Sequence, residues 1–192
     1  MNKNRLEAFT DGVLAIIITI MVLEFKVPEN ADFQSLINLL PIFGIYTISF
    51  ILIVVHWNNH HHLLQISKSV NSKILWANHH QLFWLSIVPF ATAWVGEDYS
   101  KDIPMVFYGF ILLMKTIAYF ILEKAIIAHH KNDDCISEIL YNKYKNYITL
   151  LLYIVGIGVS FFFPLIALFI YVIILFIWFI PSKKVENVVS NF

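Results

Sequence analysis

Apolar residues are arranged along the chain in runs long enough to cross a membrane, with polar turns between them. A membrane-spanning helix needs about 20 mostly apolar residues. Polar turns lie at residues 27–32 and 96–104, and a longer polar loop begins at Lys131. The pattern predicts an all-α membrane protein in which residues 1–192 form one domain with six transmembrane helices. The predicted spans are residues 5–26, 34–62, 73–95, 103–129, 146–162 and 164–181.

The last two spans share a short apolar stretch that is divided only at residues 161–164. Pro164 follows three phenylalanines there, and proline suits the first turn of a new helix. We therefore expect a hairpin of two short helices, with one bent helix as the alternative.

The composition supports a membrane protein with almost no soluble part. The chain is 59% hydrophobic and 14% charged, whereas about a quarter of the residues in a soluble protein are charged. The net charge is zero, so no basic surface points to nucleic acid. Cys135, the single cysteine, lies in the long polar loop and cannot form an internal disulfide. Glu7 and Asp11 interrupt the first apolar run, which predicts a retained helix rather than a cleaved signal peptide.

Basic residues set the expected orientation, because they are enriched on the cytoplasmic side of membrane proteins. With the N-terminus inside, only Lys26 and Lys101 fall on outer loops, and six spans place both termini in the cytoplasm. We expect a multi-pass protein of a prokaryotic plasma membrane. The outer turns are acidic, and they either concentrate cations near a pore mouth or are ordinary solvated turns. The basic residues on the inner segments are Lys3, Arg5, Lys68, Lys73, Lys131, Lys143, Lys145, Lys183 and Lys184.

The first span opens with charged residues and continues as an almost purely aliphatic helix. Arg5-Leu-Glu-Ala-Phe9-Thr10-Asp11-Gly12 runs directly into residues 13–23. Ionisable residues inside a membrane segment are costly and generally mark function or an internal network. When the helix is projected at 100° per residue, one stripe about 100° wide collects small, hydroxyl and aliphatic side chains. The stripe consists of Gly12, Ile16, Thr19, Ile20 and Leu23.

Three segments resemble motifs of the transmembrane protein 175 family, the endolysosomal potassium channels and their prokaryotic homologues. Residues 5–12 resemble the opening RxxxFSDG signature, with Thr10 in place of the usual serine. Ser49-Phe50 followed by Trp57-Asn-Asn-His60-His61 resembles the pattern SF…WxxHH, and residues 75–93 resemble LWxN…LPFPTA. Ala91 departs from a common proline, and His79-His80 replace residues that are usually aliphatic. The resemblance covers residues 5–97.

The resemblance implies a homotetramer whose four first helices line a central pore. Ile16, Ile20 and Leu23 fall on the hydrophobic ring positions of the family, and Thr19 falls on a hydroxyl ring position linked to potassium preference. A narrow aliphatic ring forces an ion to shed part of its hydration shell and can gate by dewetting. The implied function is passive, potassium-preferring cation conduction. Permeant potassium would lie near Ile16 and Thr19, with no bound metal centre or cofactor.

The resemblance also implies a polar network that pins the first helix to the second and third near the cytoplasmic boundary. Its role would be to hold or switch the pore helix rather than to touch ions, and Gly12 would permit close helix approach. In a low-dielectric site Arg5 and Asp11 need each other or polar neighbours, unless Arg5 extends to the lipid headgroups. The expected members are Arg5, Phe9, Thr10, Asp11, Gly12, Trp57, His60 and Asn78.

The histidines and one lysine inside a predicted span leave other interpretations open. His56 and His60 lie one turn apart, a spacing that zinc sites use, and histidine also titrates near neutral pH. We favour polar interfacial histidines, with a proton-permeable leak channel and a membrane histidine metal-binding protein as alternatives. Lys115 lies in the middle of the fourth span and is expected to pair inside the bundle, along the face of Tyr119 and Glu123, or at a subunit interface. No nucleophile–base pattern or phosphate loop suggests an enzyme.

Overall fold

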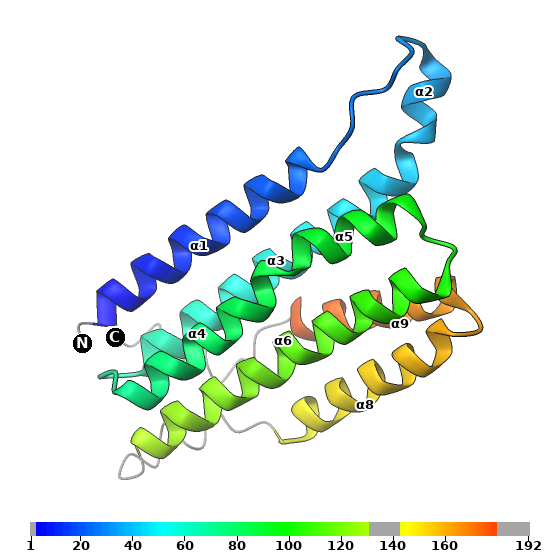
Figure 1. Cartoon of the computed structure of the whole chain (residues 1–192). Helices are drawn as coiled ribbons and strands as arrows, with labels where there is room; N and C mark the ends of the chain where they lie inside the picture. Colours follow the sequence, from blue (N-terminus) through cyan, green and yellow to red (C-terminus); the bar gives the residue numbers. More distant parts are fainter. Residues whose placement is uncertain (1–2, 131–142, 180–192) are drawn as a thin grey trace.

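The chain folds into a bundle of long helices that lie side by side in the computed structural model, which describes residues 3–130 and 143–179 (Figure 1). Every regular element in these ranges is helical, so the all-α prediction is confirmed. Three of the helices, α1, α3 and α6, are long and apolar enough to cross a membrane, and α9 is a shorter apolar helix. The elements are α1 (Lys3–Leu23), α2 (Phe33–Asn38), α3 (Leu40–Ile66), α4 (Ser72–Ser86), α5 (Val88–Glu97), α6 (Asp102–His129), α8 (Lys143–Ser160) and α9 (Pro164–Phe179).

Prolines divide two of the predicted spans. The second span is α2 followed by α3, with Pro41 in the first turn of α3, and the third is α4 followed by α5, with Pro89 in the first turn of α5. Proline has no N–H to donate and its ring displaces the preceding turn, which interrupts a helix. The predicted extents 34–62 and 73–95 are therefore nearly right, but each span consists of two consecutive helices. The second of these spans is longer than predicted at its end, because α5 reaches Glu97, and α3 continues to Ile66.

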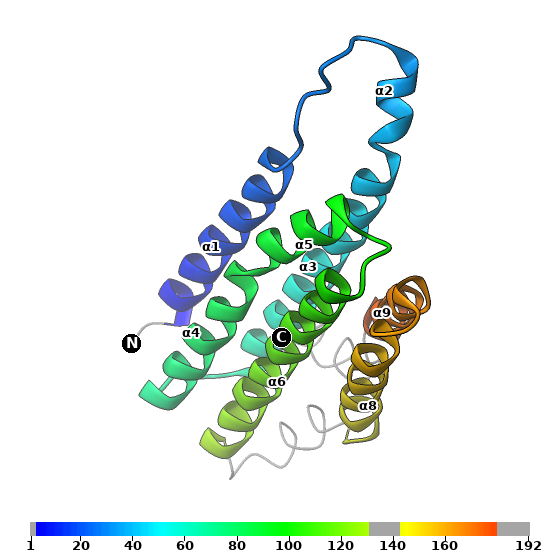
Figure 2. The same ribbon diagram turned by 45° about the vertical axis from the view of Figure 1, so that its right-hand side comes forward.

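The predicted hairpin at the end of the chain is present as α8 and α9. The chain reverses at residues 161–163, and the N–H of Phe163 donates to the Val159 carbonyl over 2.8 Å. Tyr171 of α9 packs against Gly109 of α6 and Gly156 of α8, where a methyl group would overlap the tyrosine ring or hydroxyl. These glycines let the hairpin approach α6 closely, as Figure 2 shows.

The core is centred on α6, and α1 lies at the edge of the bundle. Of the three long apolar helices, α6 is the most buried and α1 the least. One face of α1 packs on α3, α4 and α5 through Leu14, Ile17 and Met21, and Leu6 anchors its N-terminal end. The opposite face of α1 has no covering helix in the part of the chain that the structure describes (Figures 1 and 2).

The loop after α1 contacts the C-terminal end of α5. Lys26 donates to the Glu97 carboxylate, a contact that raises the pKa of Lys26, but both side chains are exposed and such pairs stabilise little. Asp32 caps α2 by accepting the Ser35 N–H over 2.7 Å, and this bond lowers the pKa of the Asp32 carboxyl.

Candidate pore face and its polar anchors

The stripe predicted on α1 coincides with the face that the chain leaves uncovered. The exposed fraction is 59% for Ile16, 42% for Ile20 and 75% for Leu23, whereas Ile17, on the packed face, is 3% exposed. The difference follows from the helical period, because Ile17 projects about 100° from Ile16. One face of α1 therefore holds the helix to its own bundle and the other is available to different neighbours.

Two non-aliphatic members of the stripe have features that suit a pore. A side chain built on Gly12 would meet no atom of this chain within 4 Å, so packing within the chain does not require glycine there. The Thr19 hydroxyl donates to the Ala15 carbonyl over 2.7 Å. Because the hydroxyl proton is used in this bond, the lone pairs of the Thr19 oxygen remain available on the exposed face.

A buried chain of hydrogen bonds joins α1 to α3 and α4. The Asn78 amide donates to Thr10 Oγ1 over 2.9 Å, and Asn78 Oδ1 accepts from His60 Nε2 over 2.7 Å. All three side chains are buried. The structure thus brings together three of the residues expected in the signature network, and it places them where a lost partner would leave a buried polar group unsatisfied.

A second anchor of α1 lies at the surface. Trp57 Nε1 of α3 donates to Asp11 Oδ1 over 2.7 Å, and the Trp57 ring stacks on His61 with centroids 5.5 Å apart. Asp11 therefore has a partner in the chain, but the partner is an indole N–H rather than the guanidinium considered from sequence.

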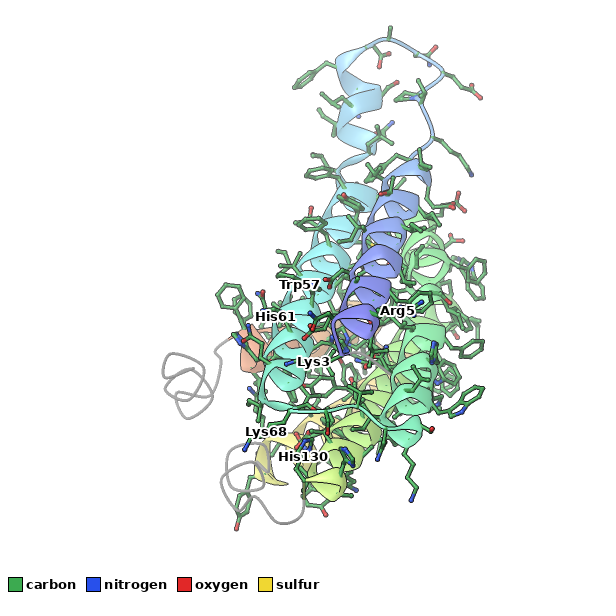
Figure 3. All side chains as sticks on the ribbon, turned by 90° about the vertical axis from the view of Figure 1, so that its left-hand side faces the viewer. Lys3, Arg5, Trp57, His61, Lys68 and His130 are labelled. Atoms are coloured by element: carbon green, nitrogen blue, oxygen red, sulfur yellow. The ribbon has the colours of Figure 1, made fainter. Side chains whose placement is uncertain are left out.

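The expected pairing of Arg5 with Asp11 is absent from the described residues. Arg5 is exposed and forms no hydrogen bond or ion pair with any of them. The two side chains are six residues apart on one helix, so they project about 120° apart. Figure 3 shows Arg5 and Trp57 on opposite sides of α1. Phe9 is half exposed and its ring contacts His79 at 5.6 Å between centroids.

A third polar contact uses motif residues to which the sequence assigned no role. Thr92 Oγ1 donates to Ser49 Oγ over 2.9 Å, and Ser49 Oγ shares a hydrogen bond of 2.8 Å with the Tyr108 hydroxyl. These buried groups link α5, α3 and α6. Ser49 and Thr92 both lie in family motifs, which marked them as candidate functional residues. Their spacing in the sequence did not show that the two side chains contact each other.

The histidines are dispersed rather than gathered around a metal site. Gln81 donates to His56 over 2.6 Å, Trp84 donates to His80 over 3.0 Å, and His129 bonds to Ser69 and Asn71. Among residues 3–130 and 143–179, no group of three His, Cys, Asp or Glu side chains is placed to hold a metal ion.

The expected pairing along the face of Lys115 does not form within the described ranges. The Glu123 carboxylate instead accepts from the Asn146 amide over 3.2 Å, and the Tyr119 hydroxyl donates to the Asn59 carbonyl over 3.3 Å. Lys115 and Glu123 are eight residues apart, which is about 12 Å along a helix and too far for direct pairing.

Comparisons with known proteins identify the family. The family model described as endosomal/lysosomal potassium channel TMEM175 matches residues 5–89. A protein of Chryseobacterium sp. named as a potassium channel is 51% identical over 187 residues, which are 97% of each chain. The chain belongs to the TMEM175 family. A potassium channel of Streptomyces collinus is 30% identical over 128 residues, or 62% of each chain.

A solved structure of the family supports the fold. The crystal structure of a lysosomal potassium-selective channel TMEM175 homolog from Chamaesiphon minutus has a TM-score of 0.79 and 27% sequence identity, covering 92% of this chain and 95% of that one. The resemblance seen in the motifs is thereby confirmed. The prediction that the chain is not an enzyme is also confirmed, because these TMEM175 relatives are named as channels. Membership of this family together with the apolar helices makes the chain a membrane protein.

Proposed function

We propose that the protein is a homotetrameric channel that conducts potassium passively, in preference to sodium, through a pore lined by four copies of α1. One observation carries the proposal: Ile16, Thr19, Ile20 and Leu23 occupy the uncovered face of α1 in a chain whose relatives are named potassium channels. A single helix cannot enclose a pathway, so several copies of this face are required.

Exposure to lipid alone would explain the aliphatic side chains of this face but not the others. Arg5, Gly12 and Thr19 are exposed on it as well, and lipid-facing positions rarely carry a charge or need a glycine. Neighbouring copies of α1 would account for all three residues. Gly12 would allow two helices to approach closely, Thr19 would face a water-filled pathway, and Arg5 would lie at its aqueous inner mouth.

The constriction would be built from aliphatic rings spaced along the helix. Ile16 and Ile20 are one turn apart and Leu23 follows, so four copies would form rings at successive levels. Potassium loses its hydration shell more cheaply than sodium, and four Thr19 hydroxyls would partly replace the lost water. Potassium would therefore lie near Ile16 and Thr19.

The topology that fits this pore has six crossings in one domain of residues 1–192, in a prokaryotic plasma membrane. Here α2 with α3, and α4 with α5, each make one crossing. The bias of basic residues places both termini in the cytoplasm. The contacts of Thr10, Asn78 and His60, and of Asp11 with Trp57, then lie toward the inner side and hold α1 in position.

Ion flux from liposomes that contain the purified protein tests the proposal. Separate potassium and sodium gradients should give faster potassium flux, and native mass measurement of the same preparation should give four chains. Equal flux of both ions would refute the preference, and proton flux without potassium flux would indicate a proton leak instead. A conducting monomer or dimer would refute the pore architecture.

A further inference from the structure

A small cavity lies inside the helical bundle, away from the pore face of α1. Its volume is about 40 Å³, it is partly open to the surface, and its lining comes from α3, α6, α8 and α9. Since about 10–15 Å³ holds one water molecule, the cavity has room for a small ion with a water molecule but not for a lipid headgroup. The polar lining residues are His56, Asn59, Lys115, Thr116, Tyr119 and Tyr153.

Lys115 is an unpaired cation on the wall of this cavity. Its side chain is 7% exposed, and no hydrogen bond or ion pair joins it to any residue of the ranges 3–130 and 143–179. It lies at the middle of α6, the most buried of the long apolar helices. A buried charge at such a depth is costly unless something neutralises it.

The described side chains around Lys115 offer no negative charge. No Asp or Glu lines the cavity, and Glu123, the next acidic residue on α6, is directed to Asn146. The neighbouring Thr116 hydroxyl donates to the Leu112 carbonyl, and the Asn59 amide donates to the carbonyls of Val55 and Trp178. A negative charge that pairs with Lys115 would therefore have to come from outside the described chain.

We propose that this cavity binds a small monovalent anion of the chloride class against Lys115 Nζ. The anion would neutralise the buried ammonium and accept hydrogen bonds from it. Because α1 does not line the cavity, this anion is a resident stabiliser of the α3, α6, α8 and α9 packing rather than a permeating ion. The proposal does not depend on the pore, so failure of one leaves the other standing.

Thermal unfolding of the purified protein at fixed potassium concentration tests the site. Replacing gluconate, which is too large for the cavity, by chloride or bromide should raise the melting temperature saturably, by about 2 °C or more. Lys115→Met should abolish this rise. Lys124→Met, which removes an exposed lysine from the same helix, should keep it.

Three outcomes of this measurement overturn the proposal. Equal melting in gluconate and chloride would mean that the cavity holds only water, and a chloride effect that survives Lys115→Met would place the ion elsewhere. Stabilisation by oleate but not by chloride would point to a lipid carboxylate and would also contradict a small anion. If Lys115→Met does not assemble, crystals of the unaltered protein grown in bromide decide: anomalous density beside Lys115 supports the site, and its absence refutes it.

Discussion

At the residue scale, the position of α1 depends most on Asn78. This side chain is fully buried and uses its amide N–H for Thr10 and its carbonyl for His60. Leaving a buried polar group without its partner costs about 1–3 kcal/mol, more than a typical hydrogen bond contributes. The two hydrogen bonds of Asn78 therefore join α1, α3 and α4, and their loss would destabilise the packing of all three helices.

Asn78→Ala should lower the stability of the protein by about 1–3 kcal/mol, because Thr10 and His60 are left unsatisfied. Thermal unfolding of the purified protein measures this. Asn38→Ala on the exposed short helix α2 is the matched control and should change little. Potassium preference should be unchanged in the Asn78→Ala channels that assemble. Equal melting of the two variants would show that the buried chain contributes nothing.

Thr19 is the residue to which we assign selectivity. Thr19→Val keeps the branched shape but removes four hydroxyl oxygens from the proposed pore, so the permeability ratio of potassium to sodium should fall more than the conductance. Reversal potentials under potassium and sodium gradients report the ratio. Thr47→Val is the control, because Thr47 makes the same hydroxyl bond to the carbonyl four residues earlier, on α3. An equal effect of both substitutions would contradict the assignment.

At the scale of elements, the two faces of α1 have different tasks. Ile17→Ala should destabilise the protein by about 2–5 kcal/mol, because it opens a cavity in the core. Ile16→Ala and Ile20→Ala should instead raise the leak of ions, since they remove apolar bulk from the proposed barrier. Flux and thermal unfolding, measured on the same variants, separate the two effects.

Val22→Ala provides the flux control for these variants. Val22 is exposed and aliphatic but lies outside the predicted stripe, so its truncation should leave flux nearly unchanged. Ile17 is unsuitable as a flux control because it is buried. A leak caused by Val22→Ala and not by Ile16→Ala would mean that a different side of α1 faces the pore.

The elements show which parts of the structure were predictable from the sequence. Pro164 was recognised as a helix start because it follows three phenylalanines and proline suits the first turn of a helix. Pro41 and Pro89 lie inside runs of spanning length, so hydropathy concealed the breaks that they cause. The helical period grouped the residues of the stripe on α1, but the resemblance to the TMEM175 family was needed to single out this face.

The polar contacts could not be predicted in the same way. Thr10 and Asn78 are 68 residues apart in the chain, and only the packing of α1 on α4 brings them together. Ser49 and Thr92 are 43 residues apart, and their spacing in the sequence did not predict the hydrogen bond between them. The lack of an ion pair at Lys115 among the described residues was also not predictable. The sequence shows which residues of a helix could pair, but not which of them bind a residue of another helix instead.

At the scale of the whole molecule, the bundle is a support that presents one face of α1. The core formed around α6 and the α8–α9 hairpin fixes α3 and α5, and these in turn hold the packed face of α1. The core contacts that position α1 therefore lie on one of its faces. The other side is uncovered within the described residues, as the proposed symmetric pore requires.

The most direct test of this account is cadmium block of channels that carry a single cysteine on α1. In a background where Cys135 is changed to serine, Leu23→Cys would place four thiols around the pore axis, and cadmium applied from outside should stop potassium flux. Val22→Cys, one residue earlier and also exposed, should remain conducting because it lies off the stripe. Block of Val22→Cys with sparing of Leu23→Cys would show that the uncovered face of α1 does not line the pore.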